Sequence, residues 1–214
     1  MLFKKVFHKL KNDTETIPPE TGLSLVGRKV VLREKNLDDV LEDYIWRKDP
    51  ELAELDATRP ISMSFTDYHK YMREELKYDT YYSVRFAVDT LDGLHIGNCM
   101  YYDINKRRQE AELGIMIGNR DYWDQGYGSD TVNTLINYVF SYTNLTKIYL
   151  HTLKENHRAR KSFIKAGLLE IRSVRRSGKD FVRMEAIKQD WLDPEYQDQQ
   201  VNVLSQELTG KKNL

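Results

Sequence analysis

The sequence predicts an α/β domain built on a mixed, mostly antiparallel twisted sheet of about seven strands flanked by helices. Three observations predict this fold. Residues 82–117 hold three β-rich runs joined by short turns, which is the order expected of antiparallel hairpins. Glycines at positions 126 and 128 then precede a segment whose apolar residues recur at helical spacing. A strand, a helix and two further strands follow over residues 147–187.

The length of 214 residues suits one well-packed domain with tails. We expect residues 1–24 to form an N-terminal arm and linker, residues 25–192 the domain, and residues 193–214 a polar tail. Met1–Lys11 mixes apolar residues with lysines, so as a helix it would have one apolar and one basic face. It is either a membrane-surface or partner-binding segment, or an arm that packs on its own domain or a neighbouring subunit or stays disordered. The second interpretation is favoured.

Composition excludes several classes of function. The 33 basic and 33 acidic side chains balance, so no global positive field would attract nucleic acid. The one cysteine, Cys99, rules out an internal disulfide framework and fits a reducing compartment. No apolar run approaches the roughly 20 residues that cross a bilayer. We therefore expect a cytoplasmic protein with no integral membrane segment and no nucleic-acid partner.

The first third of the chain predicts a strand followed by two helices. Lys29–Glu34 has a β-branched centre and is expected to be a strand. Asp38 is the expected cap of the first helix, which Pro50 closes or interrupts. Ser64 and Asp67 resemble a capping box that opens the second helix.

The remaining elements alternate in type along the chain. The Asp92-Gly93 turn predicts a hairpin between the first two of the following strands. Gly167 is expected to end the helix His157–Ala166. The expected strands are Tyr82–Asp89, Ile96–Asp103, Ala111–Ile117, Lys147–Leu153, Leu169–Arg175 and Phe181–Ile187; the expected helices begin after the glycine turn and at His157–Ala166.

The turn Gln125–Ser129 lies between a strand and a helix. A helix N-terminus exposes unpaired amides, and glycines let a ligand approach the backbone, so the turn suits a pyrophosphate. A Walker loop requires lysine and then serine or threonine after its last glycine, but Gly128 is followed by Ser129 and Asp130. A Rossmann turn requires a third glycine and normally lies earlier in the sheet. A tight turn that binds nothing would explain the glycines but not the pattern around them.

Several short motifs in a fixed order resemble the GNAT superfamily of acyl-coenzyme A N-acyltransferases. The similarity is greatest to the branch that contains the ribosomal-protein N-terminal acetyltransferases and spermidine acetyltransferase, and it covers roughly residues 25–192. The motifs are Val31-Leu32-Arg33, Trp46 with Asp49-Pro50, Glu112-Leu113-Gly114-Ile115-Met116-Ile117, Tyr122-Trp123-Asp124-Gln125-Gly126-Tyr127-Gly128, and Asn156 to Gly167-Leu168. Trp123 is typical of this branch, whereas Asp124 replaces a common glycine and has no explanation from sequence.

The resemblance implies acetyl-coenzyme A as donor, with no metal, and a primary amine of a small molecule or a protein N-terminus as acceptor. A homodimer is a possible assembly. The pantetheine arm would run along the backbone of Ile115, Met116 and Ile117. The pyrophosphate would rest on the amides of Gln125, Gly126, Tyr127, Gly128 and Ser129, and Asn156, Ala159 and Phe163 would lie beside the coenzyme.

The resemblance also places a general base on Glu112, with Glu110 as a less favoured alternative. The competing interpretation of Glu112 is a strand-end carboxylate in an ion pair. A lysine-like amine is about one part in a thousand or less deprotonated at pH 7, so a proton acceptor is needed. His151 could face the cleft or the far side of the sheet, and a structural role is favoured.

One departure from the family concerns the general acid. Many relatives have a tyrosine seven residues after the asparagine, where this chain has Phe163. Ser162, Tyr127 or a water are substitutes that the spacing does not support. A noncatalytic acetyl-coenzyme A sensor with the same fold is therefore the alternative function.

Charges near the expected acceptor pocket conflict. An acidic group would suit a cationic amine, whereas a basic group on the last turn would suit an acidic acceptor. The acidic residues are Asp49, Glu51, Glu54 and Asp56, and the basic residues are Arg175, Arg176 and Lys179. Solvated surface is the favoured interpretation of both groups.

Overall fold

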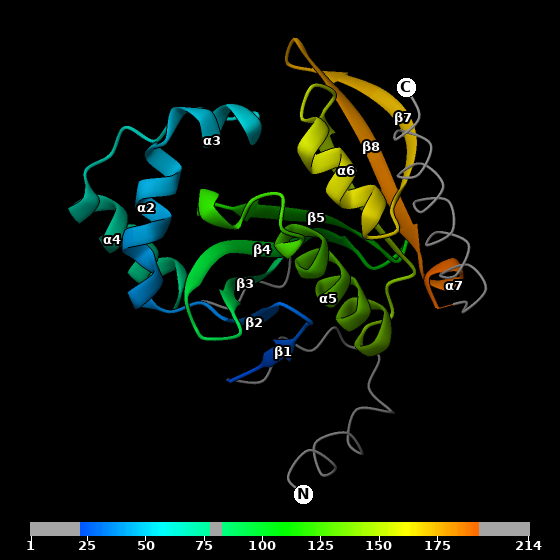
Figure 1. The fold of residues 1–214 in the computed structure, drawn as a ribbon, viewed down its shortest axis with the longest axis horizontal. Helices are drawn as coiled ribbons and strands as arrows, with labels where there is room; N and C mark the ends of the chain where they lie inside the picture. Colours follow the sequence, from blue (N-terminus) through cyan, green and yellow to red (C-terminus); the bar gives the residue numbers. More distant parts are fainter. Residues whose placement is uncertain (1–21, 78–82, 193–214) are drawn as a thin grey trace, which may run out of the picture.

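The computed structural model describes residues 22–77 and 83–192, and within them the chain forms an eight-stranded mixed sheet with helices packed against it (Figure 1). Helices α5 and α6 lie in front of the sheet in Figure 1, whereas α2, α3 and α4 group at one side. The expected arm up to residue 21, the tail from residue 193 and Tyr82 lie outside the described residues. None of the helices in the described ranges is long and apolar enough to cross a lipid bilayer.

The strands match the expected positions closely. Their order in the sheet is β1-β2-β3-β4-β5-β6-β8-β7, and every neighbouring pair is antiparallel except β5 with β6. The strands are β1 Ser24–Val26, β2 Val30–Glu34, β3 Ser83–Thr90, β4 His95–Asn105, β5 Glu110–Ile117, β6 Lys147–Leu153, β7 Leu169–Arg176 and β8 Lys179–Ile187. The sequence predicted about seven strands. The additional strand, β1, is an edge strand of three residues, which is too short to show a periodic pattern in the sequence.

The helices begin at identifiable caps. Asn36, and not the expected Asp38, caps the first helical turn, because its side chain accepts a hydrogen bond from the Asp38 amide. Pro50 begins α3 with Asp49 as its cap, since proline fits the first helical turn. The Ser64 cap is confirmed. The elements are η1 Leu37–Asp39, α2 Val40–Lys48, α3 Pro50–Leu55, α4 Phe65–Glu75, η2 Arg120–Tyr122, α5 Tyr127–Tyr142, α6 His157–Lys165 and α7 Lys188–Trp191.

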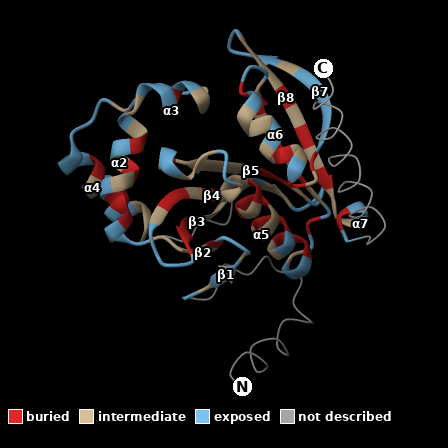
Figure 2. Cartoon of the chain, in the orientation of Figure 1, coloured by how far each residue is buried: buried red, intermediate tan, exposed pale blue. Residues whose placement is uncertain are grey.

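The apolar face of α5 lies on the sheet and forms the centre of the core (Figure 2). Five of its side chains at helical spacing, Val132, Leu135, Ile136, Val139 and Phe140, have no exposed surface. This confirms the amphipathic pattern that predicted the helix. Burial of each such side chain contributes about 1.5–3 kcal/mol, so α5 is fixed on the sheet.

Helix α2 is fixed to the end of β5 by a close contact with glycine. The ring of Trp46 covers Gly118, where a Cβ atom would overlap the indole. Trp46 is buried, and its ring lies 5.0 Å from that of His95 on β4. The absence of a side chain at Gly118 therefore allows α2, and α3 after it, to approach the open end of β5.

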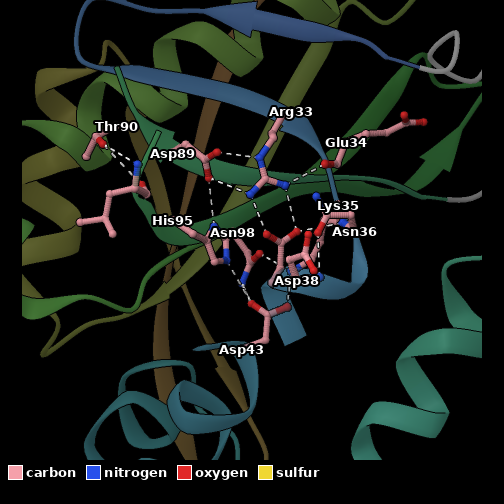
Figure 3. Close-up of polar contacts among 12 residues, drawn as sticks. Arg33, Glu34, Lys35, Asn36, Asp38, Asp43, Asp89, Thr90, His95 and Asn98 are labelled. Carbon is pink, nitrogen blue, oxygen red and sulfur yellow. Dashed lines mark hydrogen bonds and ion pairs between the residues drawn. The ribbon is translucent and has the colours of Figure 1, made fainter. Parts of the chain in front are cut away.

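A cluster of charged side chains joins β2, β3, β4 and the start of α2 (Figure 3). The Arg33 guanidinium donates to both Asp39 and Asp89, each at 2.6 Å for its shortest contact. Lys35 contacts Asp43 and Asn98, and Asn98 also donates to Asp43. Both oxygens of each aspartate at the start of α2 are therefore used to hold it on the sheet.

His95 completes this cluster. Its Nδ1 lies 3.2 Å from Asp89 Oδ1 and its Nε2 lies 3.5 Å from Asp43 Oδ1. Burial acts to raise the pKa of Asp39, but hydrogen bonds from Arg33 and from the Asn36 amide outweigh it, so the pKa lies below its ordinary value of 3.8. The ionised carboxylate is the form that stabilises the fold.

The cluster predicts acid-sensitive stability. Because the pKa of Asp39 is lower when folded, its contribution is present above about pH 4 and is lost as pH falls through the folded pKa. We expect Asp39→Asn to lower the free energy of unfolding by about 1.5–3 kcal/mol at pH 7 and by less at pH 3. Urea unfolding of wild type and variant at both pH values measures this.

The control is Asp38→Asn, since Asp38 is exposed on the same turn. It should change stability by less than about 0.5 kcal/mol. If Asp39→Asn lowered the free energy of unfolding equally at pH 7 and pH 3, this would contradict the assignment of a lowered pKa to Asp39.

Candidate functional site

The site lies where the sheet opens between β5 and β6. These strands pair in parallel over only three positions, from Glu110 with Lys147 to Glu112 with Tyr149. Both strands continue, to Ile117 and Leu153, without pairing to each other. A cavity of about 980 Å³ lies at this opening, which is at the upper end of the range for small-molecule sites.

Residues from several elements meet in this cavity. Its walls come from α3, β4, β5, the loop before α5 and the first turn of α5, β6, α6, β7 and β8. Ten of the residues predicted from the sequence line it, namely Glu112, Ile115, Met116, Ile117, Gly126, Gly128, Ser129, Asn156, Ala159 and Phe163. The structure thus brings together residues that lie up to 51 positions apart, from Glu112 to Phe163.

The start of α5 forms one wall. Gly126 caps the helix with a φ of 88°, a left-handed conformation that favours glycine. A Cβ atom on Gly128 would lie 3.1 Å from Ser162 Oγ. The Ser129 hydroxyl lies 2.9 Å from Ser162 Oγ and donates to the Ser162 carbonyl at 3.0 Å, which ties α5 to α6. The helix therefore presents backbone amides to the cavity, and its dipole favours an anion.

Two predicted residues have side chains that are absent from the cavity lining. The side-chain amide of Gln125 donates to the backbone carbonyl of Asp121. The Tyr127 ring packs edge-on against Tyr122 at 4.9 Å, with Lys29 Nζ 5.3 Å from its centre. Any contact of Gln125 or Tyr127 with a ligand in this cavity would thus be made by the main chain, and the Tyr127 hydroxyl is poorly placed as a general acid.

Trp123 and Arg158 form a stack that the sequence did not reveal. The indole Nε1 donates to the Ile117 carbonyl at 2.7 Å, and the Arg158 guanidinium lies 3.1 Å from the ring centre. Burial lowers the pKa of Arg158, and the nearby charge of Asp124 opposes this. Asp124, which had no explanation from sequence, has a φ of 57° and helps to balance this cation.

Helix α6 forms the basic wall of the cavity. Asn156 caps it by accepting a hydrogen bond from the Ala159 amide at 3.1 Å. Phe163 is buried in the main core and has no proton to give. Ser162, one of the substitutes considered for the missing tyrosine, is hydrogen-bonded to Ser129. The basic lining residues of this element are His157, Arg158, Arg160, Lys161 and Lys165.

Glu112 lies at the base of the opening. Its side chain is 12% exposed, and Oε1 lies 2.8 Å from His151 Nδ1. Tyr102 is opposite Glu112 in the β4–β5 register. Burial raises the pKa of Tyr102, and the charge and hydrogen bond of Glu112 raise it further. Glu110 lies outside the cavity lining, 3.5 Å from Arg108.

The charges expected around an acceptor are largely paired. Arg120 binds Asp49 at 2.8 Å and Glu51 at 2.7 Å. Arg47 lies 3.2 Å from Asp56. On the last hairpin, Arg175 pairs with Asp180 at 2.9 Å, whereas Asp56 and Arg176 both line the cavity. The acidic signal is therefore mostly taken up by ion pairs, whereas in the basic group an ion pair is seen for Arg175.

An opened sheet, a glycine cap and a buried carboxylate thus meet at one cavity. Residues 29–169 match the family described as the acetyltransferase (GNAT) domain. This match spans more than half of the chain, so the protein belongs to the GNAT acetyltransferase family.

Similar proteins support the same assignment. The chain is 37% identical over 79 residues to "Uncharacterized N-acetyltransferase p20" of Bacillus licheniformis, covering 35% of this chain and 44% of that protein. It is 31% identical over 86 residues to spermidine N(1)-acetyltransferase of Vibrio cholerae serotype O1, covering 40% of this chain and 49% of that protein. The chain thus spans about half the length of the curated relatives it matches.

A solved structure shares the fold. Spermidine N-acetyltransferase from Vibrio cholerae, in complex with CoA and spermine, superposes with a TM-score of 0.67 and 23% identity, covering 77% of this chain and 98% of that chain. At this identity the likeness concerns the fold, and it confirms the predicted architecture.

The geometry at Gly128 predicts the effect of filling the cavity wall. A valine there would press on Ser162 and extend toward Ile117, 3.9 Å from the position of a Cβ atom. We expect Gly128→Val to remove most of the stabilisation by acetyl-coenzyme A, which for wild type is about 2.7 kcal/mol at 100 times the dissociation constant. Thermal unfolding with and without ligand measures it.

The control is Gly93→Ala on the β3–β4 turn, where no atom lies within 4 Å of a Cβ position. Its φ of 88° predicts a loss of about 1–2 kcal/mol in stability with the ligand effect unchanged. Undiminished ligand stabilisation of Gly128→Val would contradict the location of the site.

Proposed function

We propose that this protein is an N-acetyltransferase that transfers the acetyl group of acetyl-coenzyme A to a primary amine. One observation carries the proposal: the glycine cap of α5 and the Glu112 carboxylate open onto the same cavity. Such a site can hold an anionic donor beside a proton acceptor. Membership of the GNAT acetyltransferase family supports the type of reaction.

The donor would be held mainly by backbone. The amides of Gln125–Ser129 at the N-terminus of α5 suit the pyrophosphate, because the helix dipole and unpaired N–H groups favour an anion. The unpaired edge of β5 suits the pantetheine arm. The Ile117 carbonyl already accepts from Trp123, and the Met116 carbonyl faces Gly97 on β4. Because neighbouring residues of a strand direct their backbone groups to opposite edges, Ile115 is left as the backbone partner on the open edge.

The acceptor would approach the carboxylate from the face that carries Tyr102. Glu112 and Tyr102 are opposite one another on adjacent strands, and a carboxylate next to an aromatic ring attracts an ammonium group. The Vibrio cholerae relatives are named for spermidine, and one solved structure contains spermine. Polyamines are therefore the first acceptors to test, with N-terminal peptides second.

The reaction would proceed by direct attack. Glu112 takes one proton from the ammonium group, the amine nitrogen forms a bond to the acetyl carbon, the carbon–sulfur bond breaks, and the nitrogen gives its second proton to water. The coenzyme thiolate then takes a proton from water, because Phe163 has none to give. A thiol pKa near 8.5 makes the thiolate a tolerable leaving group without a strong acid.

A noncatalytic sensor remains the second candidate. The observation that favours it is Phe163, which is buried in the core where many relatives have a tyrosine. A sensor would bind acetyl-coenzyme A in the same cavity without releasing thiol.

The deciding experiment measures thiol release from acetyl-coenzyme A with spermidine, spermine, amino sugars, aminoglycosides and N-terminal peptides. We expect acetylation of at least one amine, together with thermal stabilisation by acetyl-coenzyme A. Stabilisation without any acceptor would favour the sensor. No stabilisation at millimolar ligand would overturn both candidates.

The role of Glu112 predicts a specific loss. Glu112→Gln keeps the shape of the side chain but cannot accept a proton, so we expect kcat to fall by roughly 10²–10⁴-fold with acetyl-coenzyme A stabilisation retained. The matched control is Glu110→Gln on the same strand, which lies outside the cavity lining and should keep near wild-type kcat. Equal loss in both variants would contradict the assignment of Glu112.

A further inference from the structure

The contact between His151 and Glu112 crosses the opening of the sheet. Glu112 and Tyr149 are the last paired residues of β5 and β6, and His151 lies two positions further along β6. Residues two apart on a strand share a face, so His151 is on the same face as Tyr149. Its Nδ1 lies 2.8 Å from Glu112 Oε1. The side chains thus meet where the two backbones have stopped pairing.

The surroundings of His151 leave Glu112 as its hydrogen-bond partner. The His151 side chain is 5% exposed, and within the described residues its Nε2 is buried without a partner. Tyr149 contacts the imidazole ring edge-on at 5.8 Å. Arg183, opposite His151 on β8, donates to Glu185 at 2.6 Å and stacks on Tyr149 at 3.8 Å. These neighbours shape the pocket of the imidazole without bonding to it.

A packing role alone explains this arrangement poorly. A buried polar atom without a partner costs about 1–3 kcal/mol, so an apolar side chain at position 151 would pack with less penalty. The Nδ1 contact to a carboxylate requires that Nδ1 carries the proton, because a carboxylate only accepts. The imidazole is therefore a donor aimed at Glu112.

A hydrogen bond of this kind has two effects on a carboxylate. The last torsion of a glutamate is broad, and a fixed donor restricts it. A donor also stabilises the ionised form, which is the form that accepts a proton. Glu112 and His151 both line the cavity, so both effects act inside it.

We propose that His151 is a positioning residue for acetyl transfer, holding the Glu112 carboxylate oriented toward the amine. This inference rests on the proposed N-acetyltransferase function. One proton passes from the ammonium group to Glu112 and later to solvent, the amine displaces the coenzyme thiolate, and the second proton that the nitrogen loses reaches the thiolate through water. His151 donates through Nδ1 throughout and neither gains nor loses a proton.

The test compares His151→Leu with His151→Asn. Leucine removes the donor, whereas the asparagine Nδ2 takes the place of the histidine Nδ1. We expect His151→Leu to lower kcat by about 10–100-fold, a part of the roughly 10²–10⁴-fold that a general base supplies, with the KM for acetyl-coenzyme A within about twofold. His151→Asn should recover most of kcat. His69→Leu on α4 is the control and should be unchanged.

The outcomes separate the two proposals. If wild type acetylates no amine, both the function and the inference are overturned. If wild type is active and His151→Leu keeps kcat within about twofold, the inference alone fails. It also fails if Leu and Asn variants lose kcat equally while acetyl-coenzyme A still stabilises both. If His151→Leu does not fold, the kcat values of His151→Asn and His151→Gln are compared instead. The glutamine amide matches the position of Nε2 and not Nδ1, so the inference requires a higher kcat for His151→Asn.

Discussion

The short parallel pairing of β5 and β6 is the constraint on which the site depends. Each strand is fully engaged with its other neighbour: β5 pairs with β4 as far as Ile117, and β6 pairs with β8 along its whole length to Leu153. Sheet twist rotates neighbouring strands relative to each other, and after Glu112 and Tyr149 the two strands pair no further. The opening thus leaves one edge of β5 available at the centre of the sheet, where a ligand can reach backbone groups.

Several contacts keep the walls of this opening in place. The Ser129–Ser162 hydrogen bonds tie α5 to α6, and Trp46 on Gly118 brings α2 and α3 to the end of β5. The cluster around Arg33 and Asp43 anchors the start of α2 to the far part of the sheet. Buried ion pairs of this kind add little stability compared with apolar packing, but removal of one partner is costly. They therefore serve mainly to fix where α2 lies.

The cavity separates two kinds of chemistry. The α5 cap and the cations of α6 favour an anionic group on one side, and Glu112 with Tyr102 lies at the base of the strands on the other. This separation suits a reaction in which a phosphate-bearing donor meets a cationic acceptor. The family match agrees with this proposed reaction, in which a tyrosine at position 163 would not protonate the thiolate, because this chain has Phe163 there.

The sequence by itself determined the order of elements and the glycine cap, and it led to the proposal of Glu112 as the base, because periodicity, turn residues and short motifs are local signals. Strand β6 was predicted at its observed limits, and most other strands within two residues. It could not determine the Glu112–His151 contact, which joins residues 39 positions apart, or that Arg120 neutralises Asp49 from 71 positions away. These depend on strand register and on how far β5 and β6 separate. Such distances are set by the packing of the whole sheet, and only the tertiary structure decided them.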